Sequence, residues 1–231
     1  MQVTSSVKFI GIILFATIGL LIFLHISFQA LVYTDSFEDF LPLADRFNVD
    51  LEQSIPTWFS QTLLFVAAIL LFSIGAIKYS VRDSFVWHWL ALGAVFLYFS
   101  LDEGATLHET LNEYMKLAFT GLSGPFYFAW VIPFGILVCV FVVTYIKFLG
   151  HLSLKERVHL VSAGLIYVIG ALGMEMVGGQ VLSAELPLLY YVACFTLEEL
   201  FELVGCALLV TFALQYMSDH KHTLTLKFKN D

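Results

Sequence analysis

Six long apolar runs dominate this sequence and constrain its fold more than any other feature. They cover residues 9–33, 61–78, 86–103, 125–147, 158–178 and 187–215. A helix needs about 20 apolar residues, at about 1.5 Å each, to cross the hydrocarbon core of a bilayer. Charged residues make up only 13% of the chain, whereas about 25% is usual in soluble domains. The sequence therefore predicts an all-α bundle of about six transmembrane helices, a single domain over residues 1–231.

The first apolar run differs from a secretory signal peptide. It extends from Phe9 to Val32, and the apolar core of a signal peptide has only about 7–15 residues. We therefore expect a retained helix. The longest connection, residues 34–59, is too short to form a soluble domain of its own.

Basic residues are sorted between the two ends of the predicted helices. Nine of the eleven fall on one side, namely Lys8, Lys78, Arg82, Lys147, Lys155, Arg157, Lys221, Lys227 and Lys229. Only Arg46 and Lys116 fall on the other side. Because lysine and arginine are enriched in cytoplasmic loops, both termini are predicted to be cytoplasmic. The net charge of −8 argues against a nucleic-acid partner.

The predicted outer connection is acidic. It contains Asp35, Glu38, Asp39, Asp45, Asp50 and Glu52. The stretch from Ser54 to Ser60 follows, and Pro56 within it is typical of a first helical turn, so we expect this stretch to cap and anchor the second helix. The four tryptophans are expected in the interfacial aromatic belts: Trp58, Trp87, Trp89 and Trp130.

Ionisable residues cluster at the end of the third run. A charge inside a membrane helix costs about 2.5–3.5 kcal/mol on insertion scales, so such residues usually have a function. If the helix continues past this run, Asp102 and Glu109 share one face with Tyr98. Glu103 and His108 would then point elsewhere, and a break in the helix would be needed to bring the histidine back. We favour a solvated outer surface for Glu103, as for the later Glu113.

The sixth run contains the strongest single signal. Glu198 and Glu202 are four residues apart, and Glu199 and Glu202 are three apart, so at least two carboxylates share a face. Apolar residues surround them for several turns on both sides. Cys194 and Cys206 continue the same four-residue step. We interpret these cysteines as packing residues, with a thiolate ligand as the alternative.

Residue counts along the predicted spans place these polar groups at a similar depth in the bilayer. Asp102, Glu175 and His25 each lie about 24 Å along a predicted span, counted at about 1.5 Å per residue from the inner side. Glu198 and Glu202 lie at a comparable depth on the returning helix. No lysine or arginine lies at this depth. Because burial and like charges both disfavour ionised carboxylates, protons or bound cations must neutralise them.

The ligand types indicate a divalent-metal site. Carboxylates with histidine suit iron, manganese or zinc, and no nucleotide or flavin motif is present. The predicted metal ligands are Glu198, Glu202, Asp102, Glu109, Glu175 and His108. Weaker candidates are Glu199, His25, Glu103 and Tyr98. For His25 we favour a hydrogen-bonded helix contact over a ligand.

Short motifs link the chain to other proteins. It resembles a group of uncharacterised bacterial multi-spanning membrane proteins in the segment Pro56–Ser60, in Leu101–Glu103 with Leu107–Glu109, and in the Glu198-Glu199-x-x-Glu202 pattern. The resemblance implies a bacterial cytoplasmic (inner) membrane protein and no known activity.

The Glu198-Glu199 pair is also found in intramembrane CAAX-type proteases. Those proteins follow the pair with an arginine and with histidines on later helices. Leu203 and Val204 stand where the arginine is expected, and no intramembrane histidine follows. We therefore reject this match.

Three functions remain in competition. The first is a catalytic metal site for hydrolysis or oxidation in the outer half of the bilayer. The second is a proton- or cation-coupled transporter, which the nearly uncharged inner halves of the spans disfavour. The third is a structural or assembly subunit, which needs fewer acids. The lipid bilayer is the one firm partner, and a homo-oligomer and a larger membrane complex are both compatible with the pattern.

Overall fold

The computed structural model describes residues 2–33 and 41–220. Two groups of charges used above lie outside the described residues. They are the outer acids Asp35, Glu38 and Asp39 and the tail lysines Lys221, Lys227 and Lys229.

Helices account for almost all of the described chain. They are α1 (Gln2–Tyr33), α2 (Leu41–Asp45), α3 (Ile55–Ser80), α4 (Val86–Ala105), α5 (Leu107–Ala118), α6 (Val131–His151), α7 (Leu154–Val168), α8 (Glu175–Ser183) and α9 (Leu188–Asp219). A short 3-10 turn, η2, covers Gly124–Phe126, and a π-helical segment, η3 (Ile169–Met174), joins α7 to α8. No strand occurs in residues 2–33 or 41–220. The prediction of an all-α bundle is confirmed.

Within residues 2–33 and 41–220, five helical stretches are long and apolar enough to cross a membrane, which makes this a membrane protein. They are Ser6–Tyr33, Ile55–Ser80, Val131–His151, Leu154–Ser183 and Leu188–Asp219. A sixth span is formed only if α4 and α5 are counted together, and these two helices meet at a bend of 78°. The six predicted runs therefore correspond to five straightforward spans and one broken one.

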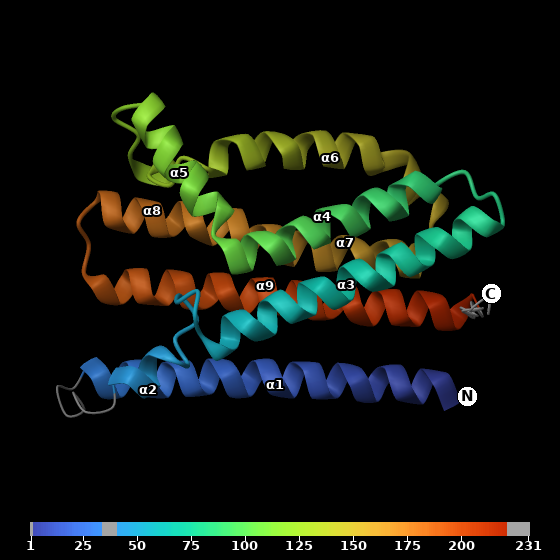
Figure 1. Cartoon of the computed structure of the whole chain (residues 1–231), viewed down its shortest axis with the longest axis horizontal. Coiled ribbons are helices and arrows are strands. Elements are labelled where there is room, and N and C mark those ends of the chain that lie inside the picture. Colours follow the sequence, from blue (N-terminus) through green and yellow to red (C-terminus); the bar gives the residue numbers. More distant parts are fainter. Residues whose placement is uncertain (1, 34–40, 221–231) are drawn as a thin grey trace, which may run out of the picture.

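The two described ends of the chain lie at the same end of the bundle (Figure 1). The long helices run side by side along the molecule, while α2, α5 and the start of α9 lie at the opposite end. Ion pairs gather at the end with the termini, including Lys78 Nζ with Asp83 Oδ2 (3.3 Å) and Lys155 Nζ with Asp219 Oδ2 (3.7 Å). This arrangement agrees with the side on which the sequence places most basic residues.

Local capping signals set the helix boundaries. At α3, Thr57 N–H donates to Ser54 Oγ (3.2 Å) and Pro56 occupies the first turn, as predicted. At α7, Ser153 and Glu156 form a reciprocal capping box. The fourth predicted run begins later than expected, at Val131, because Pro125 belongs to the preceding 3-10 turn.

Large apolar side chains fill the bundle between the two ends. Trp89 is only 1% exposed and packs against Phe148 and Phe212, with ring centroids 5.0 and 6.2 Å apart. The belt prediction is therefore wrong for Trp89 and for Trp130, which is 7% exposed, because both are enclosed by neighbouring helices.

The other two tryptophans are exposed, as a position in an interfacial aromatic belt requires. Trp58 is 65% exposed and Trp87 is 75% exposed. Both rings therefore lie on the outer surface of the bundle, where an amphipathic indole suits a membrane interface.

Close packing of α7 against α9 depends on one glycine. A Cβ atom at Gly205 would lie 2.7 Å from Tyr167 N and 2.9 Å from Ala163 O, which are backbone atoms that cannot move aside easily. Small residues at helix contacts in membranes allow this approach. Gly164, on the same pair of helices, has nothing within 4 Å of the corresponding position.

We expect Gly205→Ala to lower the stability of the protein by about 1–3 kcal/mol, because the added methyl group overpacks the α7–α9 contact. Gly164→Ala is the matched control and should be neutral or slightly stabilising, since alanine is the better helix former. Thermal unfolding in detergent checks both. Equal midpoints for the two variants would contradict this account of the helix contact.

Candidate functional site

A cavity of about 300 Å³ lies at the end of the bundle opposite the termini. Ten carboxylates line it: Asp50, Glu52, Asp102, Glu103, Glu109, Glu113, Glu175, Glu198, Glu199 and Glu202. His108 is also part of the lining, and no lysine or arginine contributes to it among the described residues. More than half of the 19 acidic residues of the chain therefore face one cavity.

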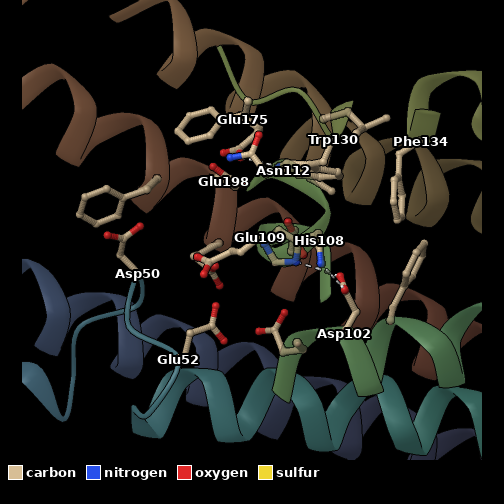
Figure 2. A pocket seen from close by; sticks show the side chains of 18 of the residues that line it. Asp50, Glu52, Asp102, His108, Glu109, Asn112, Trp130, Phe134, Glu175 and Glu198 are labelled. Atoms are coloured by element: carbon tan, nitrogen blue, oxygen red, sulfur yellow. Dashed lines mark hydrogen bonds and ion pairs between the residues drawn. The ribbon is translucent and has the colours of Figure 1, made fainter. Parts of the chain in front are cut away.

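The break between α4 and α5 brings His108 to this cavity. Thr106 adopts a left-handed backbone conformation (φ 51°, ψ 41°), which turns the chain by 78°. Asp102 Oδ1 then accepts a hydrogen bond from His108 N–H (2.8 Å), and Oδ2 accepts one from the imidazole Nδ1 (3.0 Å; Figure 2). The sequence left open whether the helix continues here. The structure has the break that is needed to bring His108 back, and the Asp102 side chain caps α5 and stabilises this break.

Helix α9 supplies three carboxylates from the membrane-embedded part of the bundle. Glu202 lies within hydrogen-bonding reach of Tyr167. Glu199 is half-buried and lines the cavity. Carboxylates in a partly desolvated site are costly unless a proton or a cation neutralises them.

The π-helical segment η3 packs directly on these acids. A Cβ atom at Gly170 would lie 2.8 Å from the carbonyl oxygen of Glu198 and 3.0 Å from Glu202 Cγ. Glycine is therefore needed for this approach, as is common where helices pack closely in membranes. π-helical segments are rare and occur frequently at functional sites.

Glu175 follows η3 and closes another side of the cavity. Trp130 Nε1–H donates a hydrogen bond to Glu175 Oε1 (2.9 Å), and the Trp130 ring lies 5.1 Å from the His108 ring. Asn112 Oδ1 accepts a hydrogen bond from Ala129 N–H (2.7 Å), which ties α5 to the start of α6. Figure 2 shows Glu175 and Glu198 on the same side of the cavity.

The connection between α2 and α3 contributes the last two acids. Figure 2 shows Asp50 and Glu52 facing the acids of the helices from the opposite side of the cavity. Asp50 is exposed to solvent, and partial desolvation together with the charges of Glu175 and Glu109 raises its pKa to about 6. Burial and the charges of Glu109 and Glu103 raise the pKa of Glu52 to about 7.

His25 of α1 contacts the connection between α2 and α3. Val49 N–H donates to His25 Nδ1 (3.3 Å), so the imidazole carries its proton on Nε2, which lies 3.1 Å from Thr196 Oγ1. His25 is buried and is not part of the cavity lining. It is therefore a helix contact, as we favoured from the sequence.

The structure brings all six of the predicted metal ligands to the cavity: Asp102, His108, Glu109, Glu175, Glu198 and Glu202. Of the weaker candidates, Glu199 and Glu103 also line it, whereas His25 and Tyr98 do not. The expectation of a solvated surface is wrong for Glu103, which lies within hydrogen-bonding reach of Ser60, because the bend after α4 leaves it inside the bundle. Glu113 is exposed at the cavity edge.

Sequence reasoning missed several residues of the site: Asp50, Glu52, Asn112, Trp130, Tyr167 and Tyr191. The only signal for Asp50 and Glu52 was the acidic character of their connection. Nothing in the spacing shows that this connection folds back over the bundle.

The carboxylates surround the cavity without converging on one point. No three His, Cys, Asp or Glu side chains within residues 2–33 and 41–220 have the arrangement needed to hold a metal ion directly. Two like charges 4 Å apart repel by about 4 kcal/mol at an effective dielectric constant of about 20. Ten acids and one imidazole therefore require protons or incoming cations to balance their charge.

We expect the metal-free protein to become less stable as the pH rises from about 4 to about 7. The pKa values of Asp50 and Glu52 are raised by folding, so the folded state holds their protons more tightly than the unfolded state. That stability is present at low pH and is lost as the pH passes through about 6 and about 7.

The measurement is the thermal midpoint in detergent with a chelator, which should fall by roughly 2–4 °C through this range. The double variant Asp50→Asn/Glu52→Gln should show a smaller fall of the thermal midpoint over this pH range. Glu185→Gln, which changes an exposed acid outside the cavity, should keep the full fall. A midpoint that rises with pH would refute the assignment.

A comparison with known proteins identifies one match. The sequence model of a family described as a domain of unknown function, DUF8692, matches residues 11–216. No curated protein and no solved structure matches the chain.

Proposed function

Because the chain belongs to the DUF8692 family, whose function is unknown, we propose a function from the site itself: a membrane-embedded cation-binding protein whose acidic cavity takes a divalent metal ion. The observation that supports this is the charge of the cavity lining. Ten carboxylates face about 300 Å³ of space without a lysine or arginine among the described residues. A divalent cation is the most compact partner for such a surface.

The donor chemistry fits a divalent ion that keeps part of its water shell. Calcium, magnesium and manganese prefer carboxylate oxygens, and they often retain water ligands. Since the carboxylates surround the cavity without meeting at a point, water molecules would complete the coordination. Among the metals considered from the sequence, manganese suits this oxygen-rich set better than zinc.

Asp102 and His108 support a catalytic role for the site. In metal sites, a ligating histidine usually donates its second ring nitrogen to a carboxylate, which fixes its orientation. His108 Nδ1 is bonded to Asp102 in this way, so Nε2 is the nitrogen left for a metal, a substrate or a proton. A bound divalent metal would supply an activated water, so hydrolysis is the reaction class we assign.

A conducting pathway is less well supported. Buried apolar side chains, including Leu71, Trp89, Leu203 and Phe212, form a continuous cluster in the bundle. That cluster offers no polar route from the cavity to the end with the termini. If the termini are cytoplasmic, as the lysines and arginines predict, the cavity faces the outer side of what we propose is a bacterial inner membrane.

We expect the purified protein to bind Mn²⁺ saturably, and Glu198→Gln with Glu202→Gln to weaken this binding by about 10–100-fold, as is typical when groups around a metal are removed. Titration followed by electron paramagnetic resonance of free Mn²⁺ measures both. Amide side chains of the same size keep the packing of α9 while they remove two charges.

Glu185→Gln is the control for the loss of an acid, because Glu185 is exposed in the turn between α8 and α9 and does not line the cavity. It should bind Mn²⁺ like the wild type. Absence of saturable Mn²⁺ binding in the wild type would overturn the metal assignment. Cation flux into liposomes that requires Glu198 and Glu202 would favour transport instead of hydrolysis.

A further inference from the structure

The acidic cavity has a second, apolar part. Six side chains form what we call the apolar limb: Phe99, Phe134, Val138, Val168, Ala171 and Leu172. They come from α4, α6, α7 and η3. In Figure 2, Phe134 lies on the side of the cavity away from Asp50 and Glu52. Acidic and apolar side chains thus line the same cavity.

Helix α6 separates the apolar limb from the lipid. Its opposite face is exposed at Ile136, Leu137 and Val140. Its contacts with α4 include the Tyr98–Phe134 ring contact (6.2 Å) and, near the other end, the hydrogen bond from Tyr145 Oη–H to the His88 carbonyl oxygen (2.8 Å). Val138 lies one turn beyond Phe134, between these two contacts. Helix α6 therefore has one face toward the limb and the opposite face on the outer surface of the bundle.

The size of the cavity limits what it holds. About 300 Å³ is at the lower end of the range for small-molecule sites, which is about 300–1,000 Å³. A complete two-chain lipid exceeds this space. One headgroup and part of one acyl chain suit it, with the headgroup among the acids and the chain in the limb.

The charge of the acidic lining selects the headgroup. A purely anionic headgroup meets ten carboxylates and no basic side chain among the described lining residues. An ammonium group is attracted by the acids, including the half-buried Glu199 of α9. Trp130 and Tyr191 also line the cavity, and aromatic rings bind ammonium groups through cation–π contacts.

We propose that the substrate of this site is an amine-bearing lipid, one acyl chain of which lies in the apolar limb. This inference rests on the proposed function, because it names the substrate class for the same cation site. Even with one divalent ion bound, the carboxylates outnumber the positive charges, so an ammonium headgroup and a metal ion are compatible.

Photo-crosslinking in nanodiscs tests the proposal. The probe is a phosphatidylethanolamine with a diazirine in the middle of one acyl chain, and the comparison probe is a phosphatidylglycerol with the same chain. We expect the amine-bearing probe to label the Phe134 and Val138 side chains about fivefold more than the anionic probe, which corresponds to a preference of about 1 kcal/mol. Labelled sites are located residue by residue, so that they are separated from the exposed Ile136 and Leu137 of the same helix.

Two tryptophan variants control for position. Ala171→Trp fills the limb and should remove most of this labelling, whereas Val143→Trp, on an exposed part of α6 outside the cavity lining, should not. Mn²⁺ binding measured on the same samples reports whether Ala171→Trp is folded. If that variant does not bind Mn²⁺, Val138→Phe, a smaller change in the same limb, replaces it.

The outcomes separate the two proposals. Loss of the labelling with Mn²⁺ binding retained supports the lipid assignment. Equal labelling by the two probes, or labelling unchanged in a folded limb variant, overturns it and leaves the cation site standing. Selective labelling without Mn²⁺ binding in the wild type overturns the metal assignment alone.

Discussion

Mutual repulsion among carboxylates is the constraint on which the rest of this structure depends. Folding gathers ten acids around one cavity and provides one imidazole but, in the described chain, no lysine or arginine to balance them. Each added negative charge in a partly desolvated space costs more than the last. Such an arrangement is stable only if protons or cations neutralise part of this charge.

Two departures from regular helix position these acids. The left-handed Thr106 ends α4 and turns His108 back onto Asp102. The π-helical segment η3 brings Gly170 against the backbone of Glu198. Both departures lie beside the cavity and not in the apolar core. Irregular backbone at membrane depth is tolerated where it lines a polar cavity, and in this protein the cavity is where it occurs.

Much of this architecture could be predicted from residue spacing. The apolar runs, the capping stretch before α3 and the shared face of Glu198 and Glu202 depend on neighbours within a few residues, and the structure agrees with them. The end of α4 was harder to predict, because the positive φ of a single residue, Thr106, decides the direction of the chain after it. Threonine is not a residue that signals such a turn.

The sequence by itself determined that the chain forms membrane helices with acids at a common depth, because helix periodicity and hydrophobic length are local properties. Only the tertiary structure decided that Asp50 and Glu52 close the cavity, that Trp130 bonds to Glu175, and that an apolar limb lies beside the acids. These features join residues far apart in the chain. Their meeting depends on how the helices bend and pack, which spacing along the sequence does not specify.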